Sequence, residues 1–269
     1  MNLPGFIKNK YTVSALILLG LLGTDIILHK GMSRVILPEP FTDKVKPSMV
    51  KPLSLALNVG EKSWTRGVNQ PEWLDKVPEK RGGIEFDAYF DRASGKFLVY
   101  HDSGRMSTLR ADSLLTEKNK RAAGGAVWMD FKNLDSGNLA PALEEALKLR
   151  EGFSLDGKFI IESSRPALLK AFSDRGFYTS YYVPFFNPYV ISEDSLVNML
   201  GSIRQDLEQH PVCSLSGYYF QYPVLRKFFP LYPVLTWADE SSLSLVGYYF
   251  KKTLQHDEMV KVILYPLED

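Results

Sequence analysis

The sequence predicts an α/β fold, a closed (β/α)8 barrel of the TIM type, preceded by an N-terminal membrane anchor helix. Eight short apolar or alternating runs of strand length follow one another from Leu53 onward. Helix-like stretches separate them, and strands that alternate with helices indicate a parallel sheet. Eight such units in about 215 residues fit the size of a closed barrel. An open doubly wound sheet is the alternative.

The composition is that of a globular protein and argues against a nucleic-acid partner. Of the 269 residues, 45% are hydrophobic and 23% are charged. The formal net charge is +1, so we expect no basic surface of the kind that binds nucleic acid. Cys213 is the only cysteine, which excludes an intramolecular disulfide and leaves the redox compartment open.

Residues 1–30 read as a membrane anchor or a signal sequence. An apolar run from Tyr11 to Thr24 follows two lysines and is extended past Asp25, which gives about the minimum length of a membrane-spanning helix. A cleaved signal peptide has a similar pattern, but no A-x-A cleavage site precedes Lys30. A buried helix of the domain is the third interpretation. The favoured prediction is a retained single-pass anchor with the barrel domain on the extracytoplasmic side.

Residues 31–52 contain four prolines and no sustained period, which predicts an extended linker. The barrel domain then occupies residues 53–269. Its predicted strands are 53–58, 83–90, 126–131, 158–162, 177–183, 214–220, 233–237 and 260–265. Helices are predicted over 139–150, 166–175 and 193–210. The helix at 166–175 follows two serines and has a proline at its first turn, a position that favours a helix start.

The stretch 82–102 carries the strongest functional signal. Glu85 and Asp87 face the same side of a strand, because side chains alternate with a period of two. A tight turn follows, and a second run at 97–100 brings His101 back beside the two carboxylates. An imidazole next to paired carboxylates is suited to metal-assisted acid and base chemistry.

Further polar residues stand at the ends of predicted strands, where the site of a (β/α)8 barrel lies. Asp130 and Lys132 share one face at the end of the third strand, Glu162 ends the fourth, and Trp237 ends the seventh. Carboxylate oxygens are the ligands that Mg²⁺ and Ca²⁺ prefer. The predicted metal ligands are Glu85, Asp87, Asp130 and Glu162. We predict Lys132 and His101 as catalytic residues, for phosphoryl charge and for proton transfer.

Each of these assignments has a structural alternative. The carboxylates of the second strand could be a solvated face, although charges inside a parallel barrel need a partner. Asp130 and Lys132 could form an internal ion pair, and Glu162 could pair with Arg165. His101 could be a hydrogen-bonded histidine in a turn.

Four segments together resemble the glycerophosphodiester phosphodiesterase and sphingomyelinase D superfamily. They are IEFD at 84–87, YHD at 100–102, MDFKN at 129–133 and LTWAD at 235–239. Within the superfamily the chain looks most like the menorin-like branch, which also carries a D-F-K segment. The resemblance implies a (β/α)8 barrel, a divalent cation held by carboxylates, and a phosphodiester or lipid-like substrate cleaved by hydrolysis or as a lyase.

The chain departs from this pattern at one position. The superfamily has a histidine at the end of its first strand, where we expect Leu55, with Asn58 as the next polar residue along the chain. We predict Asn58 and Trp237 as substrate contacts. Leucine transfers no proton, and loss of one such group typically costs about 10² to 10⁴ in rate. The sequence thus predicts a membrane-tethered, cation-dependent phosphodiesterase, with a non-catalytic binding or assembly barrel as the alternative.

Overall fold

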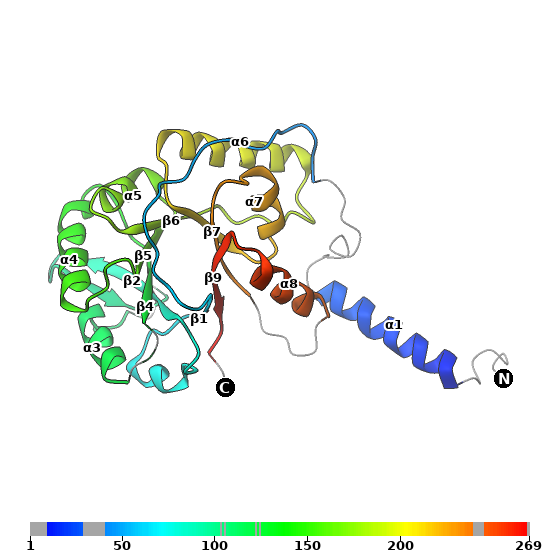
Figure 1. Ribbon diagram of the computed structural model, residues 1–269, viewed down its shortest axis with the longest axis horizontal. Coiled ribbons are helices and arrows are strands. Elements are labelled where there is room, and N and C mark those ends of the chain that lie inside the picture. Colours follow the sequence, from blue (N-terminus) through cyan, green and yellow to red (C-terminus); the bar gives the residue numbers. More distant parts are fainter. Residues whose placement is uncertain are drawn as a thin grey trace.

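The computed structural model describes residues 10–28, 41–102, 104, 106–121, 123, 125–238 and 245–267. Eight parallel strands close into a barrel, which confirms the predicted fold class (Figure 1). The barrel closes because β1 pairs in parallel with both β9 and β2. The strands are β1 (Ser63–Thr65), β2 (Gly83–Asp91), β4 (Ala126–Phe131), β5 (Phe159–Ser163), β6 (Tyr178–Tyr182), β7 (Ser214–Tyr218), β8 (Val234–Trp237) and β9 (Val260–Tyr265).

Helices lie outside the barrel, and α3 to α6 follow one another around it in Figure 1. The helices are α3 (Ala111–Arg121), α4 (Leu139–Gly152), α5 (Pro166–Ser173), α6 (Glu193–Gln209), α7 (Tyr222–Phe228) and α8 (Leu245–His256), and a 3-10 helix, η2 (Pro71–Lys76), follows β1. Strand β3 (Lys96–Val99) is antiparallel to β2, as the sequence predicts for the returning run. The seven predicted strands from residue 83 onward agree with the structure to within two residues at each end.

Burial on the two faces of β2 explains where the site lies. Ile84, Phe86 and Ala88 are fully buried in the core between the strands and the helices. Because side chains alternate across a strand, Glu85 and Asp87 face the barrel interior. The apolar residues of β2 therefore fix its orientation, and that orientation turns two carboxylates inward.

The predicted first strand is wrong, because β1 covers residues 63–65 rather than 53–58. Residues 53–58 form no strand. They run in extended form across the opening at the N-terminal ends of the strands. The backbone N–H of Leu53 donates to the Val212 carbonyl at 2.9 Å, and that of Asn58 donates to the Gly157 carbonyl at 2.6 Å. Val212 and Gly157 lie two residues before the starts of β7 and β5, so both contacts lie at this end of the barrel.

The side chains of this segment alternate like those of a strand for a different reason. Every second residue packs against the apolar cluster inside the barrel, namely Leu53, Leu55, Leu57 and Val59. The period of two therefore reflects real burial. The buried side chains pack against the end of the barrel, and the segment itself belongs to no sheet. Leu55 consequently does not occupy the end of a strand.

The N-terminal helix is present as α1 (Lys10–Leu28) and lies beside α8 (Figure 1). The expectation that it spans a membrane is not supported: within the described ranges, no helix is long and apolar enough to do so. A span needs about 20 predominantly apolar residues.

Part of the predicted linker packs on the barrel. Residues 29–40 lie outside the described residues, whereas residues 41–52 lie along α6 and α7. Thr42 is buried, and its hydroxyl donates to Glu193 at 2.8 Å. The backbone N–H of Ser48 donates to the Phe228 carbonyl at 2.7 Å. This stretch forms no helix or strand, and these contacts fix it to the helix layer.

Candidate active site

A pocket of about 490 Å³ opens at the C-terminal ends of the strands. It contains every site residue that the sequence predicts except Asn58. Those that line it are Glu85, Asp87, His101, Asp130, Lys132, Glu162 and Trp237. Asn58 is exposed at the opposite end of the barrel, because the segment that carries it is not the first strand. The structure therefore does not bring Asn58 together with the other predicted site residues.

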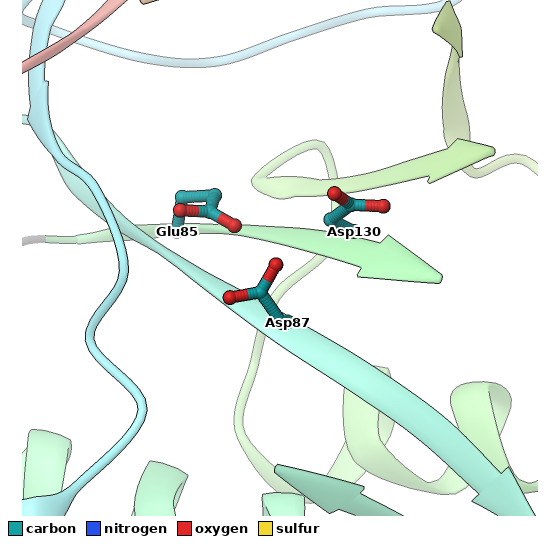
Figure 2. Close-up of side chains that lie close together, drawn as sticks. All are labelled: Glu85, Asp87 and Asp130. Atoms are coloured by element: carbon teal, nitrogen blue, oxygen red, sulfur yellow. The ribbon is translucent and has the colours of Figure 1, made fainter. Parts of the chain in front are cut away.

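Three carboxylates in the pocket form a compact cluster (Figure 2). Glu85, Asp87 and Asp130 each present an oxygen, and these oxygens lie within 4.8 Å of one another. The strand register produces this arrangement, because Asp87 on β2 pairs with Asp130 on β4 and Glu85 lies on the same face. The separation is about twice a metal–oxygen distance of ~2.4 Å, so the three groups are spaced to share one divalent cation.

The loop after β1 orients two of these acids. The backbone N–H of Gly67 donates to Glu85 Oε2 at 2.7 Å, and Gly67 has a φ of 71°, a left-handed conformation that favours glycine. Asn69 Nδ2 donates to Asp87 Oδ2 at 2.6 Å, and the Asp87 N–H donates to Asn69 Oδ1 at 2.9 Å. Gly67 and Asn69 were not predicted as site residues, because the predicted first strand, 53–58, lies before the true one at 63–65.

Lys132 lies between two of the acids. Its Nζ is 2.7 Å from Asp87 Oδ1 and is also hydrogen-bonded to Asp130 Oδ2. Burial alone would lower the pKa of Lys132, but Asp130 and Asp87 outweigh burial and raise it. Lys132 is therefore a fixed positive charge. The internal ion pair considered as an alternative for Asp130 and Lys132 is present in the structure.

The pocket remains short of positive charge. Burial raises the pKa of Glu85 and of Glu162 well above their ordinary values, and neighbouring aspartates add to both shifts. Burial also raises the pKa of Asp130, although Lys132 opposes the shift. Besides its four carboxylates, the lining of the pocket includes two cationic residues, Lys132 and Arg66.

The residues present fit a divalent cation. In the described part of the chain, Glu162 Oε2 is buried and has no hydrogen-bond partner, so an acceptor oxygen stands free beside the acidic cluster. Buried unpaired acceptors are rare and costly. Glu162 pairs with Asp130 in the strand register but lies outside the compact cluster of three. Its predicted role as a direct metal ligand stays a prediction.

No histidine stands at the end of the first strand. Thr65 ends β1, and Arg66 follows it and lines the pocket. The residues at the end of the first strand are therefore Thr65 and Arg66, and the prediction that Leu55 occupies this position is wrong. His101 is exposed and lines the same pocket, and its predicted catalytic role stays a prediction. Among the described residues, it is the one histidine in the pocket lining.

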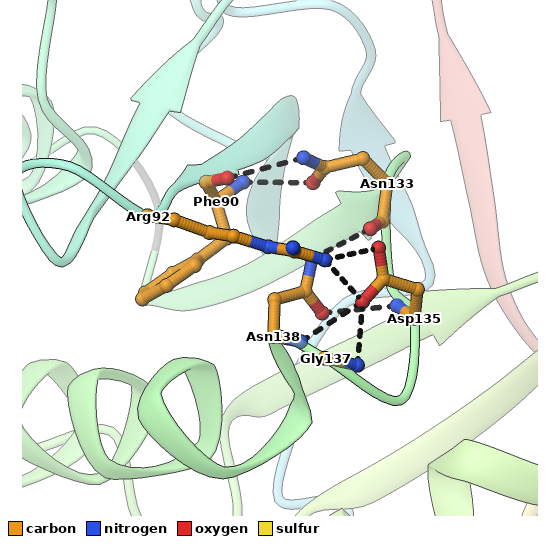
Figure 3. Close-up of polar contacts among 6 residues, drawn as sticks. All are labelled: Phe90, Arg92, Asn133, Asp135, Gly137 and Asn138. Carbon is orange, nitrogen blue, oxygen red and sulfur yellow. Dashed lines mark hydrogen bonds and ion pairs between the residues drawn. The ribbon is translucent and has the colours of Figure 1, made fainter.

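The loop after Lys132 is tied to the end of β2 (Figure 3). Asn133 Oδ1 accepts from the Phe90 N–H at 2.8 Å, and Asn133 Nδ2 donates to the Phe90 carbonyl at 3.1 Å. Arg92 Nη2 donates to both carboxylate oxygens of Asp135 at 2.7 Å. These contacts hold the backbone next to Lys132 and so limit how far its ammonium can move.

The fold and the site together define a (β/α)8 barrel with an acidic pocket suited to a divalent cation at the strand C-termini. Comparison with known proteins agrees with this class at the level of fold. No protein-family model and no curated protein matches the sequence.

The solved structures that share the fold include the following three. A glycerophosphodiester phosphodiesterase from Parabacteroides distasonis is 14% identical with a TM-score of 0.53, over 77% of this chain and 93% of that one. A putative glycerophosphoryl diester phosphodiesterase from Silicibacter pomeroyi is 13% identical with a TM-score of 0.53, over 78% and 91%. A putative glycerophosphodiester phosphodiesterase from Galdieria sulphuraria is 12% identical with a TM-score of 0.52, over 77% and 94%. The chain therefore has the barrel fold of these proteins, and its place in the menorin-like branch stays a prediction.

Proposed function

We propose that the chain is a divalent-cation-dependent phosphodiesterase that acts on a glycerophosphodiester or a phospholipid-like substrate. The observation that carries the proposal is the cluster of Glu85, Asp87 and Asp130 at the strand C-termini. Three carboxylates at this spacing inside a barrel are more than the fold requires, because buried charges destabilise a core unless they are paired. The fold shared with glycerophosphodiester phosphodiesterases supports the same reaction class.

The pocket residues divide into those that hold a cation and those that handle the phosphodiester. Glu85, Asp87 and Asp130 would hold Mg²⁺ or Ca²⁺, which supplies Lewis-acid charge to a phosphoryl oxygen when it is bound. Lys132 neutralises charge on the phosphoryl group, and its two acidic partners keep its ammonium in place. Arg66 lines the same pocket, and a guanidinium is well suited to binding phosphate oxygens.

In this scheme, His101 is the general acid or base that transfers a proton to or from an oxygen of the reacting phosphodiester. Its rim position leaves the imidazole accessible to a leaving or attacking oxygen of a bound phosphodiester. Within the described part of the chain, the pocket lining holds no second imidazole beside His101. We therefore expect a lower rate than two histidines would give, by up to the factor of about 10² to 10⁴ that one acid or base contributes.

The test measures turnover of glycerophosphocholine and of bis(p-nitrophenyl) phosphate by the full chain, with Mg²⁺, with Ca²⁺ and with EDTA. We expect turnover that needs the cation and falls by at least about 10² in Glu85→Gln and His101→Ala. Glu145→Gln is the matched control, because Glu145 is an equally buried acid that pairs with Lys96 outside the pocket. Equal turnover with and without EDTA would refute the proposal.

A binding or assembly barrel without turnover is the second candidate. The bridge from Lys132 to Asp87 and Asp130 favours it, because an ammonium already neutralises two of the three clustered acids. The two candidates differ in one measurement. Cation binding by calorimetry without turnover of any phosphodiester would establish the binding role, whereas cation-dependent turnover would exclude it.

A further inference from the structure

The pocket lining divides into a charged half and an aromatic half, because the two sets of residues come from opposite sides of the barrel. The clustered acids lie on β2 and β4, and Lys132 directly follows β4. Tyr182, Tyr218 and Trp237 end β6, β7 and β8, which lie across the barrel from β2 and β4 in the strand order. A phosphodiester whose phosphate lies at the acids can therefore direct one of its two substituents toward the aromatic half.

The aromatic half continues out of the pocket onto the surface of the protein. The ring centroids of Trp237 and Tyr218 lie 4.8 Å apart, and the centroid of Phe185 lies 5.2 Å from that of Tyr218. Trp237 is buried, whereas Phe185, in the loop that follows β6, is 54% exposed. Trp237, Tyr218 and Phe185 therefore form an aromatic track that begins inside the pocket and ends at the surface.

The outer end of the aromatic track is more than an isolated surface residue. Phe185 also packs edge to face on the buried Phe220, with centroids 5.9 Å apart and ring planes at 87°. Val190 in the same loop is 68% exposed. Single exposed apolar side chains need no explanation, but apolar side chains that extend a pocket lining indicate a binding surface. A ligand group that covers Phe185 removes its ring from water, which favours binding.

We propose that the aromatic track binds the hydrocarbon chain of a lipid phosphodiester. The inference rests on the proposed function and decides between its two substrate classes. A chain of methylenes has no hydrogen-bond donor or acceptor and needs only apolar contact, which the three rings supply from the pocket to the surface. A compact alcohol such as choline, inositol or glycerol can contact the rings inside the pocket, but it ends before Phe185 and leaves that ring in water.

The experiment compares kcat/KM of the full chain for glycerophosphocholine and for 1-hexanoyl and 1-decanoyl lysophosphatidylcholine, each below its micellar concentration. The three substrates share choline, phosphate and glycerol and differ in the acyl chain alone. We expect kcat/KM to rise with chain length and to be at least about tenfold higher for the decanoyl substrate than for glycerophosphocholine. Each methylene that becomes fully buried contributes about a factor of four, so partial burial of a few methylenes is sufficient.

Phe185→Ser shortens the aromatic track at its outer end. Because the Phe185 ring is half exposed, covering it contributes about a factor of 5 to 15, and the preference for the decanoyl substrate should fall by that factor. Met49→Ser is the matched control, because Met49 is 70% exposed, lies in the segment along α6 and α7, and does not line the pocket. This control variant should keep the full preference.

Calorimetric titration with n-octyl phosphate and with glycerol 3-phosphate, both in Mg²⁺, supplies a readout independent of turnover. Tighter binding of octyl phosphate, weakened in Phe185→Ser, supports the aromatic track as the chain-binding site. Turnover without a preference for the decanoyl substrate, or a preference that survives in Phe185→Ser, overturns the inference and leaves the phosphodiesterase proposal intact. Absence of all turnover overturns the phosphodiesterase proposal, and the titration then decides the role of the track alone.

Discussion

Replacement of Lys132 by methionine tests how the acidic pocket is neutralised. The lysine side chain is 25% exposed, and its partners Asp87 and Asp130 are 5% and 14% exposed. Removal of one partner of a buried ion pair costs about 3 to 5 kcal/mol. The partial exposure of Lys132 places the expected loss near the lower end, about 3 kcal/mol. For a chain of this size the loss lowers Tm by about 6 to 12 °C in EDTA.

A divalent cation should restore much of that loss in Lys132→Met. A cation that binds only the folded state adds about 2.7 kcal/mol at 100 times its dissociation constant. Thermal unfolding in EDTA and in Ca²⁺ or Mg²⁺ measures both effects. Lys96→Met is the matched control, since Lys96 Nζ lies 2.7 Å from Glu145 Oε1 with a similar exposure of 29%, outside the pocket. The same cation-induced rise in Tm in both variants, or unchanged stability of Lys132→Met in EDTA, would refute this reasoning.

Three further predictions concern neighbouring groups. Asn69→Ala removes both hydrogen bonds to Asp87 and should weaken cation affinity about 10- to 100-fold, measured by calorimetry. Burial raises the pKa of Glu162 above its value in the unfolded chain, so the folded state retains a proton that the unfolded chain has lost. Stability without cation should therefore fall as pH rises from about 5 through the raised pKa, and Glu162→Gln should flatten that slope in denaturant titrations. Asn138→Ala removes the donor to the Asn133 carbonyl at 2.7 Å and should cost about 1 to 3 kcal/mol in thermal unfolding.

Much of the barrel and of the pocket could be predicted because both depend on local patterns. The strand from residue 83 shows the alternation of buried and inward-facing residues, and it places Glu85 and Asp87 on one face. Asp130 on the neighbouring strand follows from parallel pairing in register. The closed barrel alone then predicts that polar residues at the strand C-termini lie close together, because it brings those ends together.

The first strand could not be predicted for an equally physical reason. Residues 53–59 alternate as a strand does, and their backbone partners, Val212 and Gly157, are distant in the sequence. The true strand β1 has only three residues, too few for a period to be recognised. Gly67 and Asn69 follow it and look like ordinary loop residues, although they orient two pocket acids.

The segment 53–59 affects the end of the barrel at which a ligand can enter. Leu53, Leu55, Leu57 and Val59 cover the apolar cluster at the N-terminal ends of the strands, whereas the described pocket opens at the C-terminal ends. A long substrate that enters at the C-terminal ends can therefore bring only one end to the carboxylates. A chain without residues 53–59 would expose this apolar cluster to water at the N-terminal ends of the strands.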